Sequence, residues 1–189
     1  GNTIITFAAA AGQQNTEVYD LLIEADKTLV SKTNPDGANA LLLAAPKDED
    51  FKLINYFKSK GLSLKSTDSN GNGIFNYVAR TGNFLVLKEL EGMGLKGTDQ
   101  AFIFTAYGAR GHVNNVEAYK FLKEVGLNPN VANEEGVTPL HIIASRSDDK
   151  EIFNFLLENG LDVNTEDTEG NTAFINAASR NNLEAVKLL

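Results

Sequence analysis

Few residues of this sequence have side chains suited to catalysis or metal binding. It contains two histidines, His112 and His141, and no cysteine, so cysteine nucleophiles, thiolate zinc sites and disulfides are excluded. The motifs H-E-x-x-H, G-x-S-x-G and G-x-x-x-x-G-K-[ST] are absent. Because a catalytic centre needs such groups within hydrogen-bonding reach of one another, we expect no enzyme activity, no cofactor and no metal site.

Carboxylates are plentiful, and two runs of them are candidates for a calcium site: Asp48-Glu49-Asp50 and Asp148-Asp149. Both runs precede a stretch with helical periodicity, and negative charge stabilises the N-terminus of a helix. We therefore expect these carboxylates to support helix starts and not to bind a metal. His112 is expected to be exposed in the turn 108–115.

The four arginines follow a pattern of their own. Arg80, Arg110, Arg146 and Arg180 each lie shortly after an alanine that ends an apolar run, and Lys47 holds the same place. Cations at a helix C-terminus interact favourably with the helix dipole, by about 0.3–1 kcal/mol each, and this explanation needs no partner. The alternative is a ladder of cations that binds carboxylates or aromatic side chains of another protein, because arginine is enriched at interface hot spots. Both explanations are open at this point.

Composition restricts the partners. The 189 residues include 17 basic and 25 acidic side chains, for a net charge of −8, which disfavours binding to nucleic acid. The hydrophobic fraction of 42% is sufficient for a packed core. No apolar run approaches the roughly 18 residues of a membrane helix, so we expect no membrane insertion. Gly1 is not an initiator methionine, so we expect a processed chain or part of a longer polypeptide.

Two series of residues reveal an internal repeat. Gly-Leu pairs begin at Gly61, Gly94, Gly126 and Gly160, in steps of 33, 32 and 34 residues, and each follows an amphipathic run. A glycine in this place predicts a helix end in the left-handed conformation. Between these pairs, helix starts are predicted by residues suited to N-capping, with Thr138-Pro139 as the clearest example. The equivalent N-cap positions are 3, 39, 73, 101, 138 and 172.

These residues resemble the ankyrin repeat. The match is best over 133–165, where Thr138–His141 spells T-P-L-H, Leu156-Leu157 ends the second helix, and 160–164 reads G-L-D-V-N. The resemblance implies an all-α ankyrin-repeat solenoid of stacked antiparallel helix pairs joined by hairpin loops. It also implies that His141 bonds nearby backbone and orders the hairpin.

We expect one domain over 1–189, with units at 1–33, 34–67, 68–96, 97–132, 133–166 and a truncated 167–189. Because the third and fourth helix starts are only 28 residues apart, the hairpin at 96–100 should be shortened or missing. Lys27 and Lys65 replace the usual glycine and asparagine of the pattern. Inner-helix alanines and bulky aromatic residues should fill the core, and five core positions are named: Leu140, Ala144, Leu156, Ala177 and Leu188.

The predicted function is that of a non-catalytic protein–protein interaction scaffold, which binds a partner through its concave face. The alternative is a structural or regulatory ankyrin arm of a longer polypeptide that carries an enzyme or channel domain. Family-variable positions lie around the helix-start glycine and just after the paired alanines, so their side chains should be free to bind. The predicted partner-binding residues are Arg80, Arg146, Arg180, Asn72, Glu135, Val137, Ser145, Glu169, Asn171 and Ser179.

The family resemblance also bears on context. It implies another protein as the partner, and we expect a monomer that does not bind nucleic acid. Ankyrin-repeat proteins are mostly cytoplasmic, while the absence of cysteine equally fits the bacterial periplasm or secretion.

Overall fold

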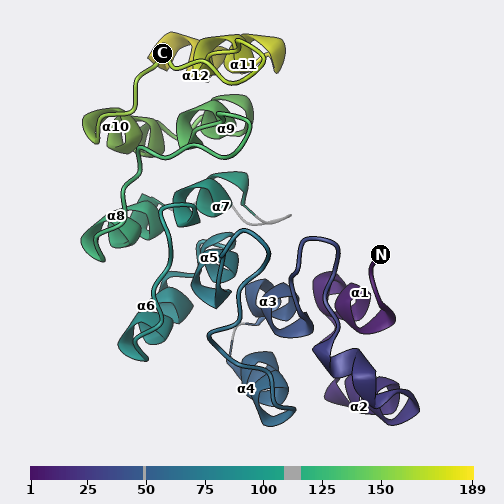
Figure 1. The fold of residues 1–189 in the computed structure, drawn as a ribbon. Coiled ribbons are helices and arrows are strands. Elements are labelled where there is room, and N and C mark those ends of the chain that lie inside the picture. The colour runs from purple at the N-terminus through teal and green to yellow at the C-terminus, as the bar shows by residue number, and fades with distance from the viewer. Residues whose placement is uncertain (49, 109–115) are drawn as a thin grey trace. The chain divides into compact units, whose positions relative to one another are not determined.

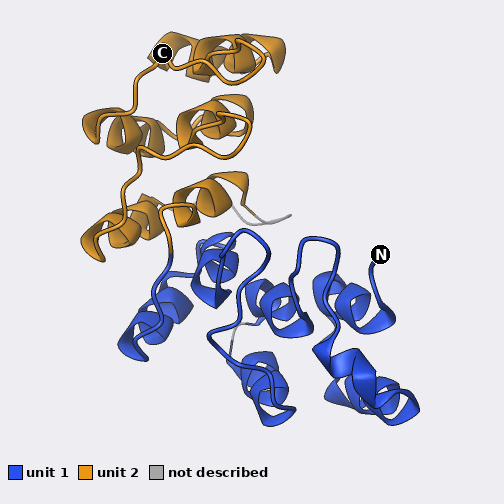
Figure 2. Ribbon diagram, in the orientation of Figure 1, with its two compact units in different colours: residues 1–97 blue, residues 98–189 orange. Residues whose placement is uncertain are grey.

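The computed structural model describes residues 1–48, 50–108 and 116–189, and its regular elements are short helices (Figure 1). These residues form two compact units, 1–97 and 98–189 (Figure 2). The boundary between the units falls where the third predicted repeat meets the fourth. Each unit is described separately below.

The first unit consists of three helix pairs. Its first helices α1, α3 and α5 pack in succession, α1 on α3 and α3 on α5. The pairs are α1 (Ile4–Ala11) with α2 (Thr16–Ala25), α3 (Ala40–Ala44) with α4 (Lys52–Ser59), and α5 (Ile74–Ala79) with α6 (Phe84–Gly92). Two short 3₁₀ helices, η1 (Lys27–Ser31) and η2 (Ala45–Lys47), follow α2 and α3.

The second unit repeats this plan with α7 (Ala101–Tyr107) and α8 (Val116–Glu124), α9 (Pro139–Arg146) and α10 (Lys150–Glu158), and α11 (Ala173–Ser179) and α12 (Leu183–Leu188). The helices α7, α9 and α11 pack in succession, and α8 packs on α10. Figure 2 shows the three pairs of this unit as successive layers.

The first helices begin where the sequence predicts. Thr3 and Thr138 each close a capping box, in which the threonine hydroxyl accepts the N–H three residues on. Asn39 and Thr172 also cap their helices through their side chains, and Gly73 is the N-cap of α5. The fourth start is shifted by one residue, because Ala101 is the first helical residue and Gln100 is the N-cap.

The glycines that end the second helices adopt the predicted left-handed conformation. Gly61, Gly94, Gly126 and Gly160 have φ between +77° and +93°. The leucine after each glycine donates its N–H to a carbonyl five residues back, as Leu161 does to Leu156 at 3.2 Å. This bond satisfies one of the free carbonyls at the helix end and turns the chain into the hairpin.

The hairpins are held by an aspartate or asparagine at their start. Asp167 accepts the N–H groups of Glu169 and Asn171, both at 2.9 Å, and Asn133 accepts those of Glu135 and Val137 in the same way. Neighbouring hairpins are then joined through backbone atoms. In the second unit the Thr168 N–H donates to the Glu135 carbonyl at 2.9 Å, and in the first unit Ser69 donates to Asp36 at the same distance.

The connection between α6 and α7 is short, as predicted. It covers only residues 93–100, whereas residues 26–39, 60–73, 125–138 and 159–172 join the other pairs. Gly97 lies against the Phe75 ring, where an added Cβ would be 2.5 Å from Cδ1. The first hairpin also departs from the pattern, because α2 ends at Ala25 and Asp26 caps η1 in place of a glycine turn.

Small and aromatic side chains fill the core. Ala44, Ala106 and Ala177 are fully buried, which allows the first helices to approach closely, while Ala8 is half-buried. Among the aromatic residues, Phe75 and Phe102 are buried, Tyr77 and Phe104 are half-buried, and Phe174 is 48% exposed.

Four of the five named core residues, Leu140, Ala144, Leu156 and Ala177, are fully buried. The fifth, Leu188, is only half-buried, and that prediction is wrong. The reason is that no described helix packs on the far side of α12.

Replacing Leu140 with alanine should lower the free energy of unfolding by about 2–5 kcal/mol, because it leaves a cavity in a fully buried site. Urea denaturation followed by circular dichroism measures this loss. Leu85, which is 76% exposed on α6, is the matched control, and Leu85→Ala should change stability by less than about 0.5 kcal/mol. Equal losses in the two variants would contradict the assigned core.

Candidate interaction surface

The described cations of the ladder lie at the ends of the first helices, as predicted. Arg146 is the last residue of α9, Arg80 and Arg180 are the C-caps of α5 and α11, and Lys47 ends η2. All three of these arginines are exposed. Arg110 lies outside the described residues.

Arg146 is held in place by an aromatic neighbour from the preceding helix pair. Its guanidinium lies over the Tyr107 ring, 5.5 Å from the centroid, and its Nη1 donates to the Tyr107 carbonyl. Tyr107 is itself 37% exposed at the end of α7. A cation over an aromatic face is stabilised by the ring quadrupole, so this arginine presents a preorganised guanidinium to solvent.

The predicted site residues of the second unit lie on its hairpins and helix ends. Glu135 and Glu169 are exposed at the hairpin tips, and Ser179 is exposed beside Arg180. Val137 and Ser145 are half-buried, and the Ser145 hydroxyl donates to the Ile142 carbonyl at 2.9 Å. Within this unit, therefore, charged side chains at the tips accompany arginines at the helix ends.

Two predicted site residues are structural and not free. Asn72 is only 6% exposed, and its side chain donates to Asp68 and accepts from Asn76. Asn171 is half-buried, and its amide bonds Asp167. The expectation that these side chains do not build the stack is wrong, because asparagine at this position closes the hairpin that starts at Asp68 or Asp167.

His141 has the structural role that the resemblance implied. Its Nδ1 lies 2.8 Å from the Thr138 hydroxyl and accepts the Thr138 N–H at 3.2 Å. Its Nε2 lies 3.0 Å from the Asn171 carbonyl of the next hairpin. The ring is 1% exposed and connects two successive repeats. The second histidine, His112, lies outside the described residues.

The carboxylate runs support helix starts. Asp149 caps α10, and the Asp48 carboxylate accepts the Ile54 N–H at 2.7 Å near the start of α4. Asp48 is 3% exposed, and burial raises its pKa above the ordinary aspartate value. Glu49, the middle residue of the first run, lies outside the described residues. Phe51, the N-cap of α4, takes the left-handed conformation with φ of 63°.

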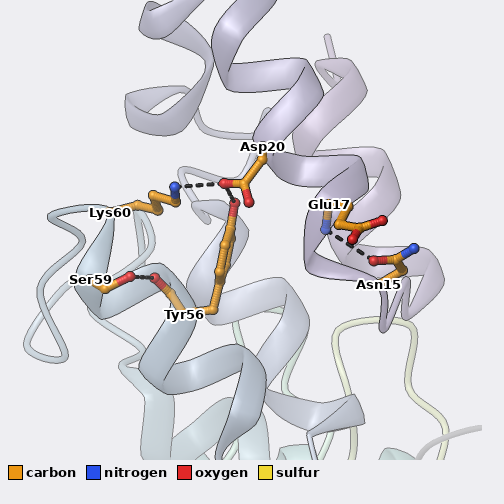
Figure 3. A network of polar contacts seen from close by, with 6 residues as sticks. All are labelled: Asn15, Glu17, Asp20, Tyr56, Ser59 and Lys60. Atoms are coloured by element: carbon orange, nitrogen blue, oxygen red, sulfur yellow. Dashed lines mark hydrogen bonds and ion pairs between the residues drawn. The ribbon is translucent and has the colours of Figure 1, made fainter.

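One polar network was not foreseen from the sequence. Asp20 on α2 accepts the Tyr56 hydroxyl at 2.8 Å and lies 2.6 Å from the Lys60 ammonium, next to α4 (Figure 3). The hydrogen bonds from Lys60 and Tyr56 lower the pKa of Asp20, and burial together with the Asp20 charge raises that of Tyr56. The network joins α2 to α4, which are the second helices of two successive pairs. Its members are too far apart in sequence to form a recognisable motif.

The described residues contain no group of three or more histidine, aspartate or glutamate side chains able to hold a metal ion. None of the described helices has the length and apolar character that spanning a membrane requires. The surface left to consider is the one made by the hairpins and the ends of the first helices.

Comparison with known proteins agrees with this architecture. The family model for ankyrin repeats (3 copies) matches residues 105–189. Residues 105–189 of this chain are ankyrin repeats. The predicted all-α ankyrin-repeat solenoid is therefore the correct fold class. No curated protein sequence matches the chain.

Solved structures show the same fold along nearly the whole chain. An ankyrin repeat domain from Acinetobacter baumannii is 24% identical, with a TM-score of 0.56, over 97% of this chain and 94% of that one. A chain in the structure of a predatory endopeptidase from Bdellovibrio bacteriovorus in complex with an immunity protein is 20% identical. Its TM-score is 0.62, over 100% of this chain and 97% of that one.

Replacing His141 with alanine should destabilise the protein by about 1–3 kcal/mol, because buried polar groups of Thr138 and Asn171 lose their partner. Chemical denaturation measures the loss, and hydrogen exchange should show faster opening of 167–171. His141→Asn keeps a short polar group beside Thr138 but does not reach Asn171, so its loss should be intermediate. An unchanged stability of His141→Ala would contradict the structural role.

The stability of Asp48→Asn relative to the native chain should rise as the pH rises from acid to neutral. The raised pKa of Asp48 means that the folded state favours the protonated carboxyl, so its stabilising contribution is present at low pH and is lost as the carboxyl ionises. Asp26 is the control of opposite sign, because hydrogen bonds from Thr28 lower its pKa. Asp26→Asn should lose relative stability over the same range. Thermal melts across a pH series measure both trends, and parallel trends would contradict the assignment.

Proposed function

We propose that this ankyrin-repeat protein is a non-catalytic scaffold that binds a partner protein through the concave face formed by its hairpins and the ends of its first helices. The observation that carries the proposal is the set of exposed polar and charged side chains on the hairpins and at the ends of the first helices. In the second unit they are Arg146, Arg180, Glu135, Glu169 and Ser179. Tyrosine and arginine together, as at Tyr107 and Arg146, are typical of interface hot spots.

Two further findings support binding to a protein. Ankyrin repeats are generally protein-interaction modules, and one of the similar structures is itself a complex of an endopeptidase with an immunity protein. The net charge of −8 disfavours a polyanionic partner such as nucleic acid, since counterion release needs a basic track.

The proposal is tested by capture of partners from the native organism with charge-reversed variants. The double variant Arg146→Glu/Arg180→Glu should lose a protein that the native chain retains, while its melting temperature changes little because both side chains are exposed. The matched control is Lys120→Glu/Lys187→Glu, which makes the same change of charge on the second helices α8 and α12. The control should retain the protein.

Two results would overturn the concave face as the binding surface. One is equal retention by both double variants. The other is loss of the protein only from the variant on α8 and α12.

A further inference from the structure

The charge of the protein is concentrated in the second unit. Residues 98–189 contain fourteen acidic against seven basic side chains, whereas residues 1–97 contain eleven against ten. No lysine or arginine occurs between Lys123 and Arg146, or between Lys150 and Arg180. The two complete hairpins of this unit, 125–138 and 159–172, therefore carry only carboxylates as charged groups. They are Glu134, Glu135, Asp162, Glu166, Asp167 and Glu169.

The arginines at the helix ends do not pair with these carboxylates. Where the second unit is described, its ion pairs join Lys120 to Glu117 and Lys187 to Glu184, and neither Arg146 nor Arg180 takes part in one. The hairpin carboxylate of Asp167 is instead occupied by its own backbone. Two exposed guanidiniums are thus able to bind a carboxylate from outside the unit, although the unit itself has twice as many acidic as basic side chains.

Arg146 and Arg180 occupy the same place in successive repeats. Each follows a buried alanine near the end of its helix, Ala144 in α9 and Ala177 in α11, and these two helices pack against each other. The axes of packed helices lie about 8–10 Å apart. Two arginine side chains can span this distance and contact one small anion between them. In the structure the Arg146 guanidinium lies on Tyr107 of α7, the helix on the other side of α9 from α11, so binding of a shared anion exchanges this contact for the anion.

We propose that Arg146 and Arg180 together bind a single carboxylate of the partner protein, and that lysine or arginine residues beside this carboxylate face the acidic hairpins. The inference rests on the proposed function and names the chemistry that the same face recognises. A guanidinium binds a carboxylate through two parallel hydrogen bonds, and such charge-assisted bonds are stronger than neutral ones. The basic flanks follow from complementarity, because an acidic segment alone would meet the repulsion of the hairpins.

Nuclear magnetic resonance of the arginine side chains tests the inference directly. The chain has only four arginines, so their Nε–Hε signals can be assigned by substitution. One probe is acetyl-Lys-Asp-Lys-amide, with a side-chain carboxylate, and a second is acetyl-Lys-Lys-Ala with a free C-terminal carboxylate. The control that lacks a carboxylate is acetyl-Lys-Asn-Lys-amide. The Arg146 and Arg180 signals should move together and saturate with at least one carboxylate probe, and the control should move neither.

The two carboxylate probes distinguish a side chain from a chain terminus as the source of the anion. Arg146→Lys/Arg180→Lys keeps the charge but removes the planar fork, and it should weaken probe binding by about tenfold. Binding should also weaken as salt is added, because the flanking lysines act through charge.

Several results would overturn the inference. They are no saturable movement of the two signals, equal movement of all four arginine signals, or equal binding of the asparagine control. If partner capture still depended on Arg146 and Arg180 in that case, the proposed function would stand without the carboxylate chemistry. Capture that ignores both arginines would instead overturn the proposed function itself.

Discussion

A pair of short helices cannot bury its apolar side chains alone, and this constraint governs every other feature of the protein. Among the described residues the longest α-helix is α2, with ten residues, and isolated helices of this length are marginal in water. Each pair becomes stable only when its neighbours cover it. Fully buried alanines such as Ala44 and Ala177 permit the close approach that this cover requires. Stability therefore comes from contacts between successive repeats.

The same stacking determines the spacing of the exposed side chains. Backbone bonds between hairpins, such as Thr168 to Glu135, and the contact of His141 with Asn171 set the distance between successive repeats. Side chains at equivalent positions are consequently displayed in rows. Arg146 and Arg180 form such a row at the helix ends, and Glu135 and Glu169 form one at the hairpin tips. The proposed binding surface needs no cavity, because the stacking that buries the core already fixes the spacing of its side chains.

Departures from the repeat pattern are compensated by contacts specific to this chain. In the short connection of residues 93–100, a close approach of Gly97 to Phe75 replaces hairpin contacts. On the other side of this connection, Asp99 accepts the Asn128 N–H and Gln100 donates to the Ala132 carbonyl. In the first unit, the Asp20, Tyr56 and Lys60 network joins α2 and α4. These alternative contacts allow a degenerate repeat to keep a packed core without the residues that the repeat pattern usually has.

The sequence by itself determined where the helices begin and end and which repeat they form. These signals are local, because a threonine cap or a left-handed glycine acts on groups within about five residues of itself. Only the tertiary structure decided which polar side chains are free. Asn72 and Arg146 were both predicted to bind a partner, yet Asn72 is buried and Arg146 is exposed on Tyr107. Burial of Asp48, exposure of Phe174 and half-burial of Leu188 likewise depend on which neighbours cover them. Those neighbours are remote in sequence, and a local pattern carries no information about them.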